Sequence, residues 1–585
     1  MKIYENHPIF SLKMQENDRV QHHFLKNYLI CAYSKRMEAV RIKSVQRERV
    51  VFMSEVFYQP KGGWVGDTIP FAHNGKFYIF YLHDERKGHT EDEYGYRTSW
   101  NLLITEDGVH FEDRGVVLPV GGYEDADYAC YTGSVIAGKD GRFHLFYTAQ
   151  NNYNPRYHRD GRPLQFVAHA TSEDLIHWEK DPKARFGADE RIYEPFDWRD
   201  PFVFYNEEEE CYNMLLAARL QGAGDKNGGC VGLCRSKDLI HWQAAEPFYH
   251  PESYMTHECP DLFRMGNKWY LVYSTFSEKF ATHYRMSDSL GGPWTAPVED
   301  TFDGRAFYAA KTAKAHGHRW AFAWVPTRRG ESDFGQYEWG GSLLIHQLKQ
   351  EVDGRLTVSP PEAVQETFAE RVIRCELITA KRGEEPLIEG QESLPEQGRT
   401  ELPESPPIEG QENSIFSKLE LHNVEGKKNL IFDGMEETCM MEADLIYEEG
   451  TRAFGLAVRQ DEKLERGYYF RLEPFYNRVV ADMWPRRVAG VNQWYIDGDK
   501  AFMVELERPF DFSRLPKRRL HLRLIAEGSI LCLYVNESLA LTMRAYESRR
   551  SHWGFFVDDG GIQVENVCLT ARNIHSETNE RRREC

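Results

Sequence analysis

Ser172–Trp178 (SEDLIHW) returns as Ser236–Trp242 (SKDLIHW), and a looser copy stands at Thr105–Phe111 (TEDGVHF). Segments rich in aromatic and branched residues alternate with these copies, and such segments favour strands over helices. There are five of them, at residues 76–81, 142–147, 211–216, 268–273 and 318–324. A period of about 50 to 65 residues is typical of four-stranded propeller blades. The repeat therefore predicts an all-β fold that begins with a five-bladed β-propeller. It argues against a large β-sandwich, whose strands seldom repeat a whole seven-residue unit.

Three carboxylates stand at related places in this repeat. Asp67, Asp200 and Glu258 each precede one of the aromatic segments. We expect the strand before each aromatic strand to be the innermost of its blade, so that the three acids take equivalent positions at one mouth of the central channel. Like charges gathered in a concave site raise one another's pKa values, which favours acid and base roles. A single Asp would be interpreted as a turn residue, but three in register indicate a site.

Five sequence blocks around these acids carry a family resemblance. They are residues 64–67 (WVGD), 129–134 (ACYTGS), 198–201 (WRDP), 254–263 (YMTHECPDLF) and 303–310 (DGRAFYAA). In their order and separation they resemble glycoside hydrolase family 32, the β-fructosidases. The Arg-Asp-Pro and Glu-Cys-Pro-Asp blocks together are specific, whereas either alone would be weak.

The resemblance implies a retaining glycoside hydrolase that forms a covalent glycosyl-enzyme. Asp67 matches the family's nucleophile, and Glu258 matches its general acid and base. Asp200 matches the residue that holds two ring hydroxyls of the sugar, and Arg199 is expected to pair with one of the acids. Residues of the blocks that are implied substrate contacts are Trp64, Tyr131, Thr132, Arg199 and Tyr308.

The chain departs from the family where the sugar is read. Gly66 stands where the family usually has Asn, residues 68–70 replace Pro-Asn-Gly, and Leu82 replaces a Gln that helps to grip the fructosyl hydroxyls. We therefore expect the chemistry to be kept and the specificity to be altered. The candidates for replacement sugar contacts are His83, Asp84, Trp100 and Trp339, because aromatic faces and short polar groups suit carbohydrate. For the two Trp side chains, blade packing is an equal alternative.

Composition fits an enzyme that acts on a neutral sugar. The 585 residues carry a formal net charge of −19, which argues against nucleic acid or an anionic membrane as a partner. No apolar stretch approaches a membrane span or a signal core, so we expect a cytoplasmic protein. The 11 cysteines show no paired metal-binding pattern. We expect reduced thiols, no metal and no cofactor.

The rest of the chain divides into distinct parts. Residues 1–55 are interpreted as an N-terminal extension, 56–375 as the propeller, 376–414 as a Pro-, Glu- and Gly-rich linker or insertion, and 576–585 as a tail. Residues 415–575 return to short alternating strands and predict a C-terminal β-sandwich. Enzymes of the resembling family also carry one. We expect this domain to be structural or to mediate formation of a homo-oligomer.

Three other functions stay open at the level of the sequence. They are a non-catalytic sugar-binding propeller, a fructosyltransferase and an arabinofuranosidase on a similar ring. Retention of all three acids argues against the first. Water access to the acceptor site decides between hydrolysis and transfer, and the sequence does not disclose it.

Overall fold

The computed structural model describes residues 51–85, 97–277, 279–369, 371–378, 416–484 and 506–572. Nearly all regular structure in these ranges is β-strand, with one α-helix, α2 (Glu362–Phe368). No helix there is long and apolar enough to cross a membrane. Most of the expected 1–55 extension and 376–414 linker, and the whole 576–585 tail, lie outside the described residues.

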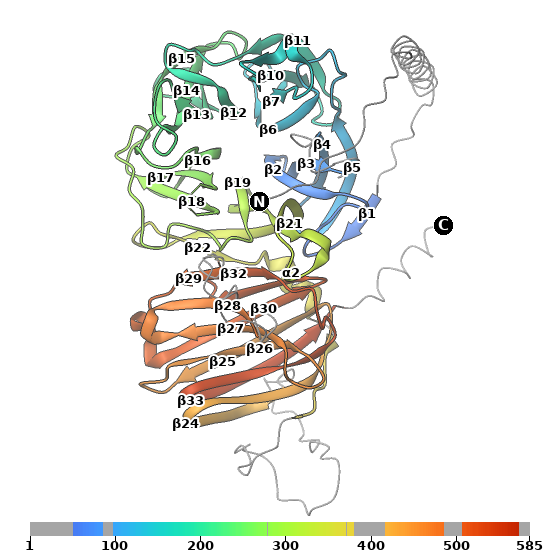
Figure 1. Ribbon diagram of the computed structural model, residues 1–585, viewed down its shortest axis with the longest axis vertical. Helices are drawn as coiled ribbons and strands as arrows, with labels where there is room; N and C mark the ends of the chain where they lie inside the picture. The colour runs from blue at the N-terminus through green and yellow to red at the C-terminus, as the bar shows by residue number, and fades with distance from the viewer. Residues whose placement is uncertain are drawn as a thin grey trace, which may run out of the picture. The chain divides into compact units, whose positions relative to one another are not determined.

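The first part of the described chain is a series of antiparallel meanders (Figure 1). The first meander is β2 (Trp64–His73), β3 (Lys76–Asp84), β4 (Ser99–Thr105) and β5 (His110–Leu118), with β1 (Val51–Ser54) beside β5. The second is β6 (Ala129–Ala137), β7 (Phe143–Gln150), β10 (Gln165–Ser172) and β11 (Glu179–Phe186), with the small hairpin β8 (His158–Arg159) and β9 (Arg162–Pro163) inserted.

The later meanders follow the same plan. The third is β12 (Tyr193–Asn206), β13 (Cys211–Leu220), β14 (Gly229–Ser236) and β15 (Gln243–Tyr249). The next is β16 (Glu258–Met265), β17 (Lys268–Thr275) and β18 (Ala281–Ser287). The last is β19 (Tyr308–Ala315), β20 (His318–Arg328), β21 (Tyr337–Gln350) and β22 (Leu356–Ser359).

The first strands of the meanders form a closed circle. β2 contacts β6, and the contacts continue in chain order through β12, β16 and β19, which contacts β2 again. Figure 1 shows these strands around the middle of the domain. Val65 also pairs with Gly341, which joins the first and last meanders in one sheet. The aromatic segments predicted from the sequence are the second strands, β3, β7, β13, β17 and β20.

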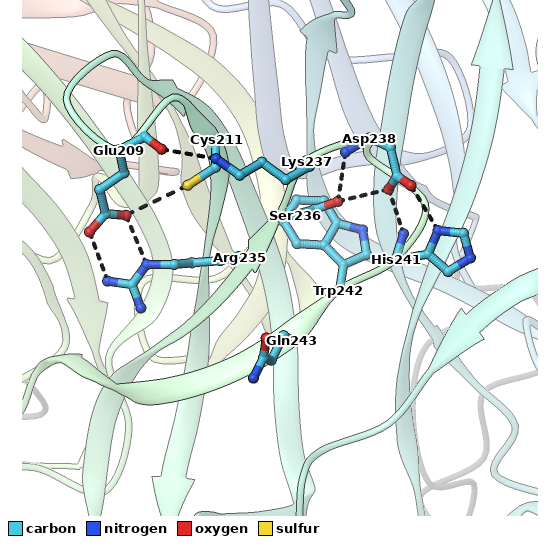
Figure 2. Close-up of a pocket in the computed structure, with 9 residues that line it drawn as sticks. All are labelled: Glu209, Cys211, Arg235, Ser236, Lys237, Asp238, His241, Trp242 and Gln243. Atoms are coloured by element: carbon cyan, nitrogen blue, oxygen red, sulfur yellow. Dashed lines mark hydrogen bonds and ion pairs between the residues drawn. The ribbon is translucent and has the colours of Figure 1, made fainter.

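The repeated heptapeptides are the turns between third and fourth strands. In the copy at Ser236–Trp242, the Ser236 hydroxyl accepts the backbone N–H of Asp238 at 3.2 Å, and Asp238 Oδ1 accepts that of His241 at 2.8 Å (Figure 2). The Trp242 ring packs edge-on against Phe146 of the preceding meander. Each turn therefore satisfies its own backbone and supplies an aromatic wedge, which is a structural reason for the motif to recur.

The C-terminal domain is an 11-stranded antiparallel sheet. The long strand β33 (Ser551–Ala571) pairs with β26 (Ala453–Gln460) along its first half and with β25 (Cys439–Tyr447) along its second. The sheet thus folds over one large apolar core and is sandwich-like. The remaining strands are β23 (Arg371–Val372), β24 (Phe416–Met435), β27 (Gly467–Glu473), β28 (Arg478–Trp484), β29 (Glu507–Pro509), β30 (Arg519–Glu527), β31 (Ile530–Val535) and β32 (Leu539–Arg544).

The structure moves one predicted boundary. β23 pairs with β33, and Ile373 and Cys375 belong to the apolar core of the C-terminal domain. Residues 371–378 are therefore part of that domain, although the sequence assigned residues up to 375 to the propeller. Pairing with β33, about 200 residues later in the same chain, decides this membership, and the composition of so short a segment carries no sign of it.

Candidate active site

A β-bulge interrupts the same place in every first strand. The pairing with the second strand shifts register between Val65 and Thr68 in β2, and at matching points in β6, β12, β16 and β19. A bulge leaves residues unpaired and re-aims their side chains. Asp67, Asp200 and Glu258 all lie at these bulges. The bulges are therefore the local structure that positions the acids.

The acids do not occupy equivalent bulge positions, contrary to the expectation from the sequence. Glu258 is the last paired residue before its bulge, Asp200 stands one residue after that point, and Asp67 stands two residues after it. The three acids therefore reach the site from different positions along their bulges. The hydrogen-bond register decides this offset, and counting residues to the next aromatic segment does not resolve single-residue steps.

Asp67 accepts hydrogen bonds from a hydroxyl and an indole, besides a longer one from the Cys259 thiol. The Thr132 hydroxyl donates to Oδ2 at 2.5 Å, and the Trp324 indole N–H donates to Oδ1 at 2.8 Å. Burial and the neighbouring Asp200 carboxylate raise the pKa of Asp67 to about 6, although the two donors act in the opposite direction. The carboxylate is therefore ionised at neutral pH, which is the state a nucleophile needs.

Glu258 has a different set of partners. Arg199 Nη2 donates to Oε1 at 2.8 Å, and the Tyr308 hydroxyl donates to Oε2 at 2.6 Å. Burial raises the pKa of Glu258, Arg199 opposes the rise, and Asp200 adds to it. Arg199 is itself fixed by Asp197, whose Oδ1 accepts from Nη1 at 2.5 Å. Two carboxyl groups with separate partner sets are suited to separate roles, one as nucleophile and one in proton transfer.

Asp200 and Cys259 lie between the two principal acids. Asp200 Oδ2 accepts the backbone N–H of Cys259 at 2.9 Å, and the Asp200 N–H donates to the Thr148 hydroxyl at 2.8 Å. Both Asp200 and Cys259 have left-handed backbones, with φ of 57° and 51°, a strained conformation that often marks functional sites. The Cys259 sulfur lies 3.6 Å from Oδ2 of Asp67 and 3.6 Å from Oδ2 of Asp200. Burial raises the pKa of this thiol far above its usual range, so it stays protonated and is no nucleophile.

Aromatic rings flank Asp67 and Glu258. Tyr308 stacks on Phe280 with ring centres 3.9 Å apart, and Trp324 lies 5.4 Å from Tyr308 and 5.9 Å from Trp339. Neither Phe280 nor Trp324 was found from the sequence. Trp324 ends the last aromatic segment and pairs directly with Tyr308. Its pairing with Tyr308 marks Trp324 as a site residue, and this pairing is known only from the strand register.

Gly66 and Trp339 fit one another. A Cβ atom on Gly66 would lie 2.1 Å from the Trp339 ring, a distance that real Cβ contacts essentially never show. The indole therefore occupies the space in which a side chain at position 66 would begin. Gly66 stands where the family usually has Asn, and the Trp339 ring fills the space beside it, next to the proposed nucleophile Asp67.

The other predicted contacts on the first meander lie close to the Asp67 bulge. Trp64 pairs with Asp84, and Val65 pairs with His83, immediately before the register shift. Trp64 and His83 are half-buried, whereas Asp84 is buried. On the second meander, Tyr131 and Thr132 lie at the bulge of β6. These residues are therefore grouped at the same end of the first strands as the acids.

Trp100 and Leu82 belong to the core instead. Trp100 is fully buried, and its indole N–H donates to the Tyr131 carbonyl at 3.1 Å. Leu82 pairs with Trp100 and lies in the same apolar cluster. Neither side chain offers surface to a sugar, so the packing alternative describes Trp100. The face of β3 that carries Leu82 is decided by pairing, which the sequence alone left open.

The three acids and Tyr308 lie in the sequence blocks that resemble one family. Residues 57–360 match the Glycosyl hydrolases family 32 N-terminal domain. The chain belongs to this family. A raffinose invertase of Escherichia coli is 29% identical over 331 residues, which cover 52% of this chain and 64% of that protein. A levanbiose-producing levanase of Bacillus subtilis is 23% identical over 561 residues, 90% of this chain and 92% of that protein.

Solved structures share the fold of this family 32 member. An exo-inulinase from Aspergillus awamori superposes with a TM-score of 0.63 at 17% identity, covering 89% of this chain and 98% of that one. The match spans just under two thirds of the first curated relatives, 64% of the raffinose invertase and 66% of a sucrose-6-phosphate hydrolase of Escherichia coli. Across the described ranges, no three His, Cys, Asp or Glu side chains are grouped so as to hold a metal ion.

Proposed function

We propose that this protein hydrolyses terminal β-fructofuranosides with retention of configuration, through a covalent glycosyl-enzyme. The observation that carries the proposal is the pair of differently held carboxylates. Asp67 accepts hydrogen bonds from Thr132 and Trp324, whereas Glu258 lies between Arg199 and Tyr308. The resemblance of the blocks around Asp67 and Glu258 to family 32 implies the same two roles, and both residues lie within the stretch 57–360 that matches the family's N-terminal domain.

The first chemical step breaks the glycosidic bond. A carboxylate oxygen of Asp67 attacks the anomeric carbon and forms an ester, while Glu258 gives its proton to the departing oxygen. In the second step Glu258 takes a proton from water, the water oxygen attacks the anomeric carbon, and the ester bond to Asp67 breaks. Asp200, anchored by the Cys259 N–H, accepts hydrogen bonds from sugar hydroxyls and offsets positive charge in the transition state.

The names of the relatives support a fructosyl substrate. They include a raffinose invertase, sucrose-6-phosphate hydrolases, levanases and an exo-inulinase. The Trp339 ring, which fills the space beside Gly66 where the family usually has Asn, supports a grip on the sugar that differs from the usual one. We therefore expect sucrose itself to be a weak substrate relative to the preferred fructoside.

Three finer points belong to the same proposal. The closed circle of first strands supports a five-bladed propeller. The cysteines of the described residues are unpaired, which supports a reducing, cytoplasmic location. Exposed Phe475, Tyr476 and Trp484 support self-association through the C-terminal domain, which light scattering at several protein concentrations would measure.

The test is a substrate screen with the purified full chain. The panel contains sucrose, raffinose, inulin- and levan-type oligomers and an aryl arabinofuranoside, with the first-formed anomer followed by NMR. Initial release of β-fructose supports the proposal, and initial release of the α-anomer overturns retention. Turnover of the arabinoside alone overturns the fructosyl assignment. Asp238→Asn, in a surface turn, is the control for Asp67→Asn, which should abolish turnover.

A further inference from the structure

Strand β32 of the C-terminal domain contacts the segments that deliver partners to both catalytic carboxylates. Thr542 and Arg544 of this strand are buried and donate hydrogen bonds to residues of the meander domain. The apolar cluster around them draws members from both domains, among them Phe307 and Ala540. β32 is therefore packed into the catalytic domain rather than resting on its surface.

Thr542 holds the segment that leads to Tyr308. Its backbone N–H donates to Asp303 Oδ1 at 2.9 Å, and its hydroxyl donates to Oδ2 at 2.6 Å. Asp303 is buried and also lies 3.2 Å from His346 Nε2. The chain then runs through buried Phe307 to Tyr308, whose hydroxyl donates to Glu258. A displacement of Asp303 is thus transmitted along a short, packed segment to the proton donor.

Arg544 holds the backbone next to Trp324. Its Nη2 donates to the Val325 carbonyl at 3.0 Å, and its Nε donates to the Pro326 carbonyl at 3.1 Å. Trp324 directly precedes Val325 and donates its indole N–H to Asp67. The guanidinium fork fixes two successive carbonyls, a geometry that a single ammonium group does not reproduce.

We propose that Thr542 and Arg544 are positioning residues for the hydrolysis proposed above, on which this inference rests. Thr542 acts through Tyr308 on Glu258. Arg544 acts through Trp324 on Asp67. The C-terminal domain is thereby part of the catalytic apparatus.

The two paths give distinguishable effects on the pH profile. The Tyr308 hydrogen bond lowers the pKa of Glu258, and the Trp324 hydrogen bond lowers that of Asp67. Weakening the Tyr308 hydrogen bond therefore moves the basic limb of the kcat/KM profile to higher pH, because Glu258 must be protonated. Weakening the Trp324 hydrogen bond moves the acid limb to higher pH, because Asp67 must be ionised. The other charged neighbours, Arg199 beside Glu258 and Asp200 beside both acids, touch neither Thr542 nor Arg544 and stay unchanged.

The first experiment compares Thr542→Val with Thr570→Val. Thr570 is a buried threonine whose hydroxyl donates to the Met440 carbonyl within the C-terminal domain. We expect both variants to lower Tm slightly. Only Thr542→Val should lower kcat, by about fivefold, and shift the basic limb of the pH profile to higher pH by about half a unit. Thr542→Ser keeps the hydroxyl and should restore both values.

A double-mutant cycle tests the route. If Thr542 acts through Tyr308, Thr542→Val adds no further loss to Tyr308→Phe. Arg544→Lys should move the acid limb of the pH profile to higher pH and should add no further loss of activity to Trp324→Phe. If Thr542→Val does not fold, this second cycle tests the proposal. Equal behaviour of Thr542→Val and Thr570→Val, or additive losses in both cycles, would overturn the inference. A wild type inactive on every fructoside would instead overturn the proposed function.

Discussion

Replacing the proposed nucleophile should make the protein more stable at neutral pH while it abolishes activity. Asp67 has its pKa raised from 3.8 to about 6, chiefly by burial and secondly by Asp200. A raised carboxyl pKa means that ionisation opposes folding. The stability contribution is fully present below pH 3.8 and is lost as pH rises through 6. Asp67→Asn removes that loss.

The magnitude follows from the shift. A rise of about 2 pKa units at 1.36 kcal/mol per unit gives about 3 kcal/mol above pH 7. This is an upper value, because the carboxylate keeps some accessible surface and the new amide satisfies Thr132 and Trp324 less well. With about 2.1 cal/mol/K per residue and a cooperative unit of about 300 to 500 residues, Tm rises by about 3 to 5 °C.

The assay is thermal unfolding of wild type and Asp67→Asn from pH 4.5 to 8. The difference in Tm should be small at pH 4.5, grow through pH 6 and level off above pH 7. Asp303→Asn is the matched control, because the interactions of Asp303 with His346, Arg508 and Thr542 together outweigh its burial and lower its pKa. Its Tm should fall at neutral pH. An Asp67→Asn protein less stable than wild type at pH 8, or a difference independent of pH, would refute the reasoning.

Three further predictions concern the proton donor and the altered sugar contacts. Glu258→Gln should slow sucrose-type substrates at least about a hundredfold more than activated aryl fructosides, because only poor leaving groups need the proton; equal losses would remove Glu258 from that role. Gly66→Asn should lower Tm and activity, because its Cβ meets the Trp339 ring at 2.1 Å, and Trp339→Ala should partly restore both; a wild-type-like single variant would contradict this packing. Leu82→Gln should lower the free energy of unfolding by about 1 to 3 kcal/mol, because it buries an amide, and should leave the activity on sucrose relative to other fructosides unchanged. A gain in sucrose cleavage would instead place residue 82 at the sugar.

Some features were readable from the sequence because their causes are local. The Ser-Asp-His turns satisfy their own backbone within seven residues, so the repeat is visible without the fold. The second strands could be predicted from their composition, because they are rich in aromatic and branched residues. Sequence blocks that resemble family 32 indicate Asp67, Asp200 and Glu258 as the proposed catalytic acids, because each block is a short run of neighbouring residues that can be recognised without the fold.

What the sequence by itself determined is thus the repeat, the strand-rich C-terminal half and the identity of the acids. Tertiary structure alone decided how the acids are held. The one-residue offsets of Glu258, Asp200 and Asp67 come from bulge register, and the roles of Trp324 and Cys259 come from side chains meeting across distant strands. Burial of Leu82 depends on the face it takes in β3. Support from Thr542 and Arg544 crosses more than 200 residues of chain. Contacts between segments far apart in the sequence leave no local pattern, because the neighbours of a residue along the chain do not specify which distant strand will lie beside it.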